Sequence, residues 1–92
     1  MIVYAEVECV IYNTHSLKDK RSVIKPLIAR IRKDFNVSIS EIDFQDLWQR
    51  TKFAIVTVAN ELLHAEKIIQ EVINVIDNDL GIERTITTID RL

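Results

Sequence analysis

The stretch Ile42-Asp43-Phe44-Gln45-Asp46-Leu47-Trp48-Gln49-Arg50 joins two β-like segments, residues 37–44 and 50–59, and the hairpin that it predicts decides the fold. Residues 2–12 alternate with a period of two along their whole length, which is typical of a strand. Residues 82–92 are rich in threonine and weakly phased, as in an edge strand. The sequence therefore predicts four strands, two of which are joined directly.

Two amphipathic segments separate the remaining strands. The first follows Ser16, a predicted N-cap, and reaches Phe35 with an apolar face roughly 100° wide. Pro26 lies inside it, and because proline lacks an N–H we expect one helix that is kinked near Pro26 or becomes regular only there. The second helix is predicted to begin after Asn60 as N-cap and to end at Gly81 in a left-handed conformation.

The order strand, helix, strand, strand, helix, strand predicts an α+β fold, a ferredoxin-like sandwich that forms a single domain over residues 1–92. Both helices would cover one face of an antiparallel sheet whose first and third strands are central. The small residues at positions 54, 56 and 58 suit the covered face, so the open face would carry Tyr4, Phe53 and Ile55. Exposed apolar patches usually mark interfaces, and these three residues are therefore predicted to contact a second subunit or a partner.

Composition is that of an ordinary globular domain, with 48% apolar and 28% charged residues among 92. No apolar run approaches the ~20 residues that a membrane span requires. The single Cys9 cannot form an internal disulfide, and its place among inward-pointing residues predicts a buried small hydrophobe. We therefore expect a cytoplasmic protein that does not engage a membrane.

Charge is distributed unevenly along the chain. The net charge is −2, yet residues 16–35 hold seven basic and two acidic residues. In a helix, four of the basic residues fall within about 60° of one another beside the apolar face: Lys18, Arg21, Lys25 and Arg32. Such a stripe can track phosphates, although a plain solvated helix face is the alternative.

The hairpin loop holds the only tryptophan, Trp48, next to Gln49 and Arg50. Trp48 could stack on a base or fill a partner's pocket, with Gln49 and Arg50 adding hydrogen bonds. Alternatively, Leu47 and Trp48 could fold back onto the end of the core. The third strand also faintly resembles an RNA-recognition motif, with Phe53 at an aromatic position.

No residue pattern points to catalysis. Glu41, Asp43 and Asp46 are interpreted as turn caps and as partners of Arg50 rather than as metal ligands, and no histidine lies near them in sequence. Neither a Ser, His and Asp set, a glycine-rich phosphate loop nor a cysteine pair is present. We therefore expect a protein that is not an enzyme and has no catalytic, metal or cofactor site.

Three segments resemble the YlxP-like family of small bacterial proteins, a domain of unknown function: residues 16–21, Ser-Leu-Lys-Asp-Lys-Arg, residues 35–43, Phe-Asn-Val-Ser-Ile-Ser-Glu-Ile-Asp, and residues 45–50, Gln-Asp-Leu-Trp-Gln-Arg. Phe53-Ala54 stands where the group tends to have Leu-Gly, and Pro26 is unusual in the first helix. The resemblance implies a ferredoxin-like fold and a bacterial cytoplasmic protein, and it implies no activity. Genes of the group often lie beside those of a translation initiation factor and a ribosome-binding maturation factor, which favours a role near the ribosome.

Two functions from different classes are compatible with these features. The first is a non-enzymatic binding module for ribosomal or other structured RNA, with contacts from Lys18, Arg21, Lys25, Arg32, Trp48, Gln49 and Arg50. The alternative is a protein–protein interaction module, a homodimer or a module that docks on a partner through the open sheet face.

Overall fold

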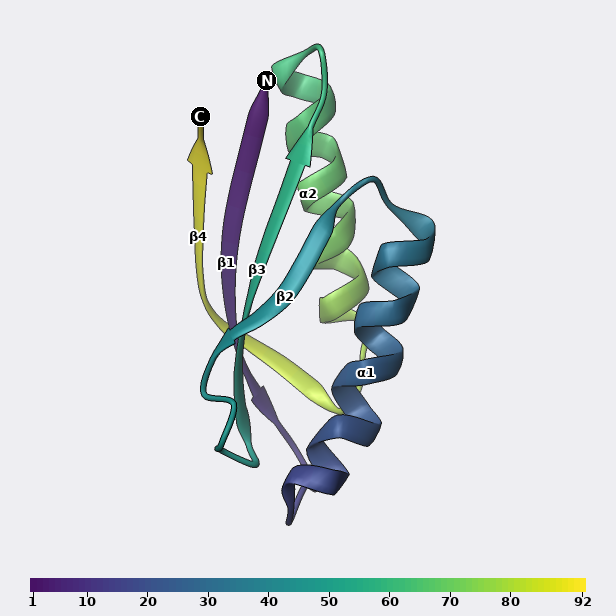
Figure 1. The fold of residues 1–92 in the computed structure, drawn as a ribbon, viewed down its shortest axis with the longest axis vertical. Coiled ribbons are helices and arrows are strands. Elements are labelled where there is room, and N and C mark those ends of the chain that lie inside the picture. Colours follow the sequence, from purple (N-terminus) through teal and green to yellow (C-terminus); the bar gives the residue numbers. More distant parts are fainter.

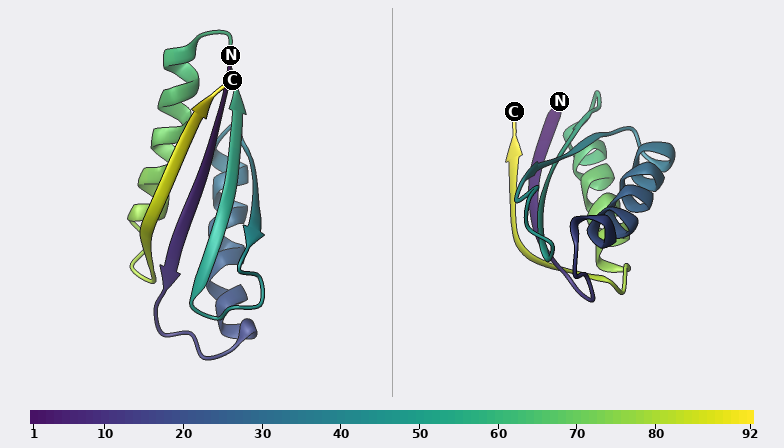
Figure 2. Two further views of the ribbon diagram at one scale, coloured as in Figure 1. Left: turned by 90° about the vertical axis from the view of Figure 1, so that its left-hand side faces the viewer. Right: turned by 60° about the horizontal axis from the view of Figure 1, so that its bottom comes forward.

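A four-stranded antiparallel sheet with strand order β2-β3-β1-β4 carries two helices on one face in the computed structural model, which describes residues 1–92 (Figure 1). The strands are β1 (Ile2–Ile11), β2 (Ser38–Asp43), β3 (Arg50–Val58) and β4 (Ile82–Arg91), and the helices are α1 (Leu17–Asp34) and α2 (Leu62–Asp77). The ferredoxin-like order βαββαβ is confirmed, with β1 and β3 central and β4 at an edge. Figure 2 shows that no helix covers the opposite face of the sheet.

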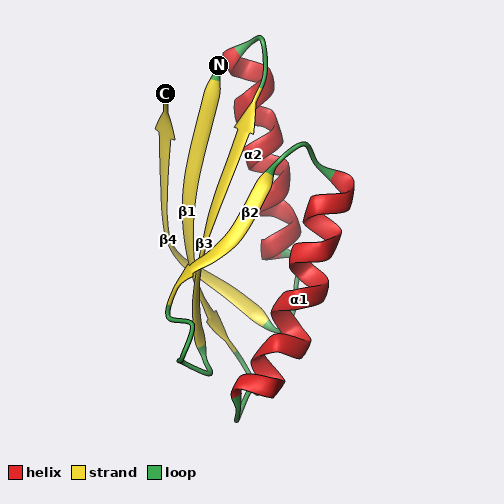
Figure 3. Cartoon of the chain, in the orientation of Figure 1, coloured by secondary structure: helices red, strands yellow, loops and turns green.

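Most of the chain lies in these six elements, joined by short connections (Figure 3). Neither helix has the length and apolar character that crossing a membrane requires.

The core is built on the strict alternation of β1. Its even-numbered side chains face the open side. Its odd-numbered side chains are buried and at most 1% exposed: Val3, Ala5, Val7, Cys9 and Ile11. The helices close this core with Ile24, Leu27 and Ile31 from α1 and with Ala65, Ile69, Val72, Ile73 and Ile76 from α2. Each large apolar side chain buried in this way stabilises the fold by about 1.5–3 kcal/mol.

The sequence-based assignment of the β3 faces is wrong. In the β1–β3 register Val7 lies opposite Phe53 and Ala5 opposite Ile55, and directly opposed residues share a face. Phe53 and Ile55 are therefore fully buried under the helices, and they cannot form an interface on the open face. Both rows of β3 are largely apolar, so alternation alone does not identify the inner one. The larger side chains fill the space beneath the helices.

The start of α1 is confirmed in detail. The Ser16 Oγ accepts the Asp19 N–H at 3.0 Å, and the Asp19 Oδ2 accepts the His15 N–H at 3.1 Å. The first bond satisfies a donor that a helix N-terminus otherwise leaves without a partner, and the second holds the residue that precedes the N-cap. The helix then continues from Leu17 through the exposed Pro26 as a single element, so its regular part does not begin at Pro26.

Both predicted ends of α2 need correction. Its N-cap is Glu61, not Asn60, and Glu61 makes no side-chain capping bond. Gly81 does not adopt a left-handed conformation, because no glycine of the chain has a positive φ. The turn after α2 is instead held by Asp79, whose Oδ1 accepts the Gly81 N–H at 2.9 Å.

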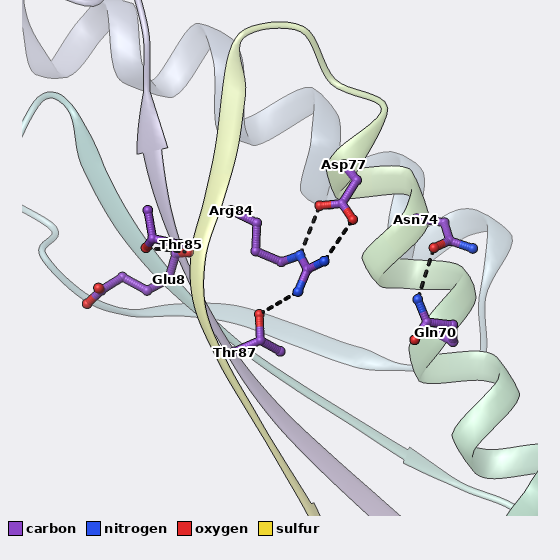
Figure 4. Close-up of polar contacts among 7 residues, drawn as sticks. All are labelled: Glu8, Gln70, Asn74, Asp77, Arg84, Thr85 and Thr87. Atoms are coloured by element: carbon purple, nitrogen blue, oxygen red, sulfur yellow. Dashed lines mark hydrogen bonds and ion pairs between the residues drawn. The ribbon is translucent and has the colours of Figure 1, made fainter.

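The end of α2 is tied to β4 by a polar cluster (Figure 4). The Arg84 guanidinium donates to both carboxylate oxygens of Asp77 at 2.9 and 3.0 Å, and to Thr87 Oγ1 at 3.0 Å. In β4 the register shifts opposite residues 7–9, where the Thr85 hydroxyl donates to the Glu8 carbonyl at 3.1 Å. The bidentate Arg84–Asp77 pair thus fixes the helix against the edge strand at its irregular point.

The corrected face assignment predicts unequal mutational costs on β3. Phe53→Ala removes a fully buried ring and should lower the free energy of unfolding by about 3–5 kcal/mol. Val56→Ala, on the half-buried open face, should lower it by about 1 kcal/mol or less. Urea unfolding of the two variants measures both values, and a larger loss for Val56→Ala would contradict the assignment.

Candidate functional site

The loop between β2 and β3, residues 44–49 and here called the Trp48 loop, is tied to the body of the protein by its backbone. The Ile11 N–H donates to the Gln49 carbonyl at 2.9 Å, and the Leu47 N–H donates to the Phe44 carbonyl at 3.0 Å. Phe44 opens the loop with φ of 61°, a left-handed conformation that non-glycine residues rarely adopt. Such a conformation persists where the surrounding contacts determine it, which is the case here.

A buried lysine fixes the start of this loop. Lys20, on α1, is 1% exposed, and its Nζ lies 2.8 Å from Glu41 Oε2 and donates to the Phe44 carbonyl at 2.7 Å. The hydroxyl of the buried Thr51 donates to the same Glu41 oxygen at 2.6 Å. The charge of Lys20 is thus neutralised by one carboxylate while its ammonium group holds the loop's first carbonyl.

Thr14, which precedes α1, holds the other end of the loop. It is 1% exposed, and its hydroxyl donates to the Trp48 carbonyl at 2.8 Å. The Gln49 Nε2 donates in return to the Thr14 carbonyl at 3.2 Å. Gln49 was predicted to contact a ligand, and its side-chain amide nitrogen instead donates a hydrogen bond that anchors the loop.

Trp48 points away from the core. Its side chain is 50% exposed and that of the neighbouring Leu47 is 44% exposed, so the interpretation in which both fold back onto the core is wrong. The two side chains border a shallow hollow of about 540 Å³, lined by His15, Asp46, Leu47, Trp48, Gln49 and Arg50. The structure thus brings all three predicted loop residues to one hollow.

Arg50 stands where the Trp48 loop meets the open sheet face. Its guanidinium carbon lies 4.0 Å from the centre of the Phe44 ring, a cation–π contact, and its Nη2 lies 3.2 Å from Glu8 Oε1. The predicted pairing of Arg50 with Asp43 or Asp46 is therefore wrong. The Asp43 carboxylate instead accepts the Phe44 N–H at 2.8 Å and caps the turn.

The basic stripe, Lys18, Arg21, Lys25 and Arg32, is exposed along α1. None of the six ion pairs of the chain involves Lys18, Arg21 or Lys25. Arg32 differs, because its Nη2 donates to the carbonyl of Ile39 in the edge strand β2 at 2.8 Å. A second shallow hollow, of about 430 Å³, lies between the stripe and β2, with Lys25, Ile28, Ala29, Arg32, Ser40 and Glu41 around it.

The start of α1 and the loop between β2 and β3 both lie at the lower end of the molecule in Figure 1. Lys18 and Arg21 belong to the same helical turn as Lys20, which contacts the first residue of the loop. The first turns of α1 therefore contact the Trp48 loop through Lys20, and the far part of the stripe runs beside β2.

On the open face, Lys52, Ala54 and Val56 of β3 replace the predicted Phe53 and Ile55. The β3–β1 register sets them beside Tyr4, Glu6 and Glu8. Because the aromatic ring of β3 is buried, base stacking of the RNA-recognition-motif kind has no platform there.

The charges that β1 and β3 place on the open face are paired. The Lys52 Nζ lies 3.0 Å from Glu6 Oε1, and the Tyr4 hydroxyl donates to Glu6 Oε2 at 2.9 Å. The hydrogen bond from Lys52, and to a lesser extent that from Tyr4, lowers the pKa of the Glu6 carboxyl. The same Lys52–Glu6 bond raises the pKa of Lys52. The acidic residues of β1 are thus neutralised by basic residues of β3.

Other reactive side chains are inert or scattered. Cys9 is buried as predicted, and burial raises the pKa of its thiol to about 12, so it stays protonated. No three or more His, Cys, Asp or Glu side chains gather closely enough to hold a metal ion.

Two residues of this site, Lys20 and Thr14, were missed by the sequence analysis. Lys20 carried a readable signal, because the spacing of Lys20, Ile24, Leu27 and Ile31 places it on the buried face of α1. Thr14 carried none, since a single threonine in a connection does not reveal a buried hydroxyl.

Variants of Lys20 should show that its ion pair with Glu41 contributes to stability and that its bond to the Phe44 carbonyl orders the Trp48 loop. Lys20→Met leaves the Glu41 carboxylate without its partner and should lower the free energy of unfolding by about 3–5 kcal/mol. Lys20→Met/Glu41→Leu removes both charges and should regain most of that loss. In both variants the Leu47 amide should exchange its hydrogen faster, because the Phe44 carbonyl has lost its anchor. Chemical unfolding and amide hydrogen exchange test this, and equal stability of the two variants would contradict it.

Comparisons with known proteins agree with the resemblance noted in the sequence. Over 87 residues the chain is 52% identical to "Uncharacterized protein YlxP" of Bacillus subtilis (strain 168), with 95% of each chain covered. Among solved structures, the de novo designed protein Foldit4 is similar with a TM-score of 0.61 at 13% identity, covering 100% of this chain and 99% of that one. A de novo designed protein with a ferredoxin fold, LFR1 1, has a TM-score of 0.56 at 17% identity, covering 100% and 87%. The two designs support the fold alone.

The match at the level of the family extends over almost the whole sequence. Residues 2–89 fit the pattern of the family described as "Protein of unknown function (DUF503)". The predicted resemblance to the YlxP-like group is therefore confirmed. The chain belongs to the DUF503 family.

Proposed function

We propose that this chain is a non-enzymatic binding module that engages structured RNA through the basic stripe and the Trp48 loop. The observation that carries the proposal is the set of three exposed cations, Lys18, Arg21 and Lys25, that have no ion-pair partner in the chain. Lys18 and Arg21 belong to the same helical turn as Lys20, which contacts the loop that carries the exposed Trp48. Free cations next to an exposed aromatic ring are the combination that RNA-binding surfaces use.

Most of the carboxylates near the stripe are paired with other cations and do not neutralise its positive charge. Glu41, which faces it, is neutralised by the buried Lys20. Glu6 and Glu8 of the open face are paired with Lys52 and Arg50. Asp19, next to Lys18, has no cationic partner and offsets one charge, but the four cations of the stripe still leave it positive on a chain whose net charge is −2.

The length of the stripe suits a nucleic-acid backbone. Lys18 and Arg32 are separated by fourteen positions, which corresponds to roughly 20 Å along a helix. A nucleic-acid strand presents several phosphates over that distance. Because the stripe offers only cations on flexible stems, it would read charge and helical shape with little selection among base pairs.

Charge reversal tests the proposal. Lys18→Glu/Arg21→Glu/Lys25→Glu should abolish binding to a ribosomal RNA fragment at low salt, whereas the wild type binds in a salt-dependent manner. Replacement by neutral Gln at the same positions should flatten the slope of log K against log salt by about 2–3, because each lost phosphate contact contributes about 0.7–0.9. Arg32 is left unchanged, since it also holds β2.

A matched control carries the same change of charge elsewhere. Arg30→Glu/Lys33→Glu/Lys67→Glu reverses three exposed basic residues outside the stripe, of which only Arg30 has an ion-pair partner, the exposed Asp34, and it should keep nearly wild-type affinity in fluorescence anisotropy. Equal losses in the two triple variants, or no binding by the wild type at low salt, would refute the proposal.

A second candidate function, self-association through the open face, is favoured by an apolar area at one end of that face. Ile2 and Val58, opposite each other in the β1–β3 register, are 41% and 60% exposed. Tyr4, Ala54 and Val56 extend this area toward the paired charges of the same face. The Glu6–Lys52 and Glu8–Arg50 pairs of this face are neutral, whereas Asp90, opposite Tyr4, and Glu83, opposite Val10, add negative charge, so association would rest on the apolar area.

Light scattering tests self-association. Val56→Glu/Val58→Glu places two charges in the apolar area and should convert a dimer to a monomer, since buried unpaired charge opposes association. Leu80→Glu is the control, because Leu80 is 99% exposed in the connection after α2 and should leave the dimer intact. A wild type that stays monomeric at high concentration would eliminate this candidate.

A further inference from the structure

We infer that the hollow beside Trp48 binds one unpaired nucleobase, so that the RNA partner combines a paired stem with a single-stranded nucleotide. This inference rests on the proposed function and names the class of RNA that the same site selects. It is carried by the rigid display of Trp48, by the chemistry of the hollow and by its position at the end of the basic stripe.

The exposure of Trp48 is built into the fold. Its carbonyl accepts the buried Thr14 hydroxyl at 2.8 Å, and the next carbonyl, that of Gln49, accepts the Ile11 N–H at 2.9 Å. Four residues before it, the Phe44 carbonyl is held by Lys20 at 2.7 Å. The backbone on both sides of Trp48 is therefore fixed, so binding would cost little conformational entropy of the loop backbone.

The size and lining of the hollow suit a flat, neutral, partly polar group. The hollow is shallow, with a volume of about 540 Å³, so it can receive one face of a flat group while the other face stays in solvent. Trp48 and Leu47 supply apolar surface, while His15, Asp46 and Gln49 supply polar groups at its border. A nucleobase matches this combination, because it has a π-face for stacking and hydrogen-bonding edges.

The charges at the hollow argue for a base rather than a phosphate. Asp46 and Arg50 contribute one negative and one positive group, and the Arg50 guanidinium is already engaged by Glu8 at 3.2 Å. A phosphate would meet the Asp46 carboxylate without a free cation of the hollow to balance it. Phosphates are better placed at Lys18 and Arg21, in the helical turn next to the loop.

This arrangement divides recognition between two parts of one surface. The stripe follows the backbone of a stem, and the first unpaired nucleotide beyond the stem places its base on Trp48. Single-stranded nucleotides in loops, bulges and ends can be splayed out in this way, whereas the bases of a perfect duplex stay stacked within the helix.

The experiment compares an RNA hairpin carrying an unpaired loop with a blunt duplex of the same number of phosphates. Trp48→Ala should weaken hairpin binding by roughly 5- to 150-fold, the contribution of one base stacked on an aromatic side chain, and leave duplex binding unchanged. Trp48→Phe should restore most of the affinity. The salt slope should be the same in wild type and Trp48→Ala, because no phosphate contact is lost.

Fluorescence gives a direct second readout, since Trp48 is the only tryptophan of the chain. The hairpin should quench its emission and the duplex should not. If charge reversal of the stripe abolishes RNA binding while Trp48→Ala changes neither affinity nor selectivity, the base site is refuted and the proposed function stands. If Trp48→Ala lowers the affinity for hairpin and duplex equally, the base site is also refuted, because Trp48 would then affect the shape of the surface and not contact an unpaired base. If no RNA binds the wild type, both fail.

Discussion

The buried ammonium group of Lys20 is the contact on which the working surface of this protein depends. It joins three elements at once, since it comes from α1, pairs with Glu41 of β2 and donates to the first carbonyl of the Trp48 loop. A lysine that is 1% exposed would be costly without such partners. With them, it fixes the distance between the helix and the loop. Apolar packing alone would leave that distance less closely defined.

Rigid anchoring explains how two exposed apolar side chains can persist at the tip of a hairpin. Loops that expose large apolar residues usually gain by folding them inward, because burial of such a side chain is worth about 1.5–3 kcal/mol. Here the carbonyls of Phe44, Trp48 and Gln49 are each bonded to a different element, so the backbone cannot rearrange to bury Trp48. The fold therefore keeps the ring outward, at a cost that a bound partner would offset.

Much of the fold could be predicted because local signals agreed. The alternation of β1 and the capping bonds of Ser16 depend on neighbouring residues, and both were read correctly from the sequence. The faces of β3 could not be read in the same way, since Phe53 and Ile55 alternate with Ala54 and Val56 and both rows are apolar. Only the pairing with β1 distinguishes them, and pairing is a long-range property.

In the candidate site, too, the features set by neighbouring residues could be predicted and those set by long-range contacts could not. The exposed cations of α1 follow from helical periodicity, so the stripe was predictable, as was the turn that carries Trp48. The direction of Trp48 was not, because it depends on Thr14, which lies 34 positions away and reaches the loop only in the folded chain. A hydroxyl in a short connection gives no signal in a single sequence.

An acidic chain with one unpaired basic stripe has a consequence for selectivity. The net charge of −2 works against general attraction to polyanions, so three free cations alone would give weak, salt-sensitive binding. Useful affinity then requires a second contact that does not depend on charge, and the only exposed tryptophan lies at the end of the stripe. Because Lys20 fixes the first residue of the loop against α1 and Thr14 fixes Trp48 itself, a partner that uses both contacts must satisfy them with one geometry. Under the proposed function, the buried lysine would thus link stability to selectivity, because the contact that fixes the loop would also limit which RNA shapes reach both parts of the surface.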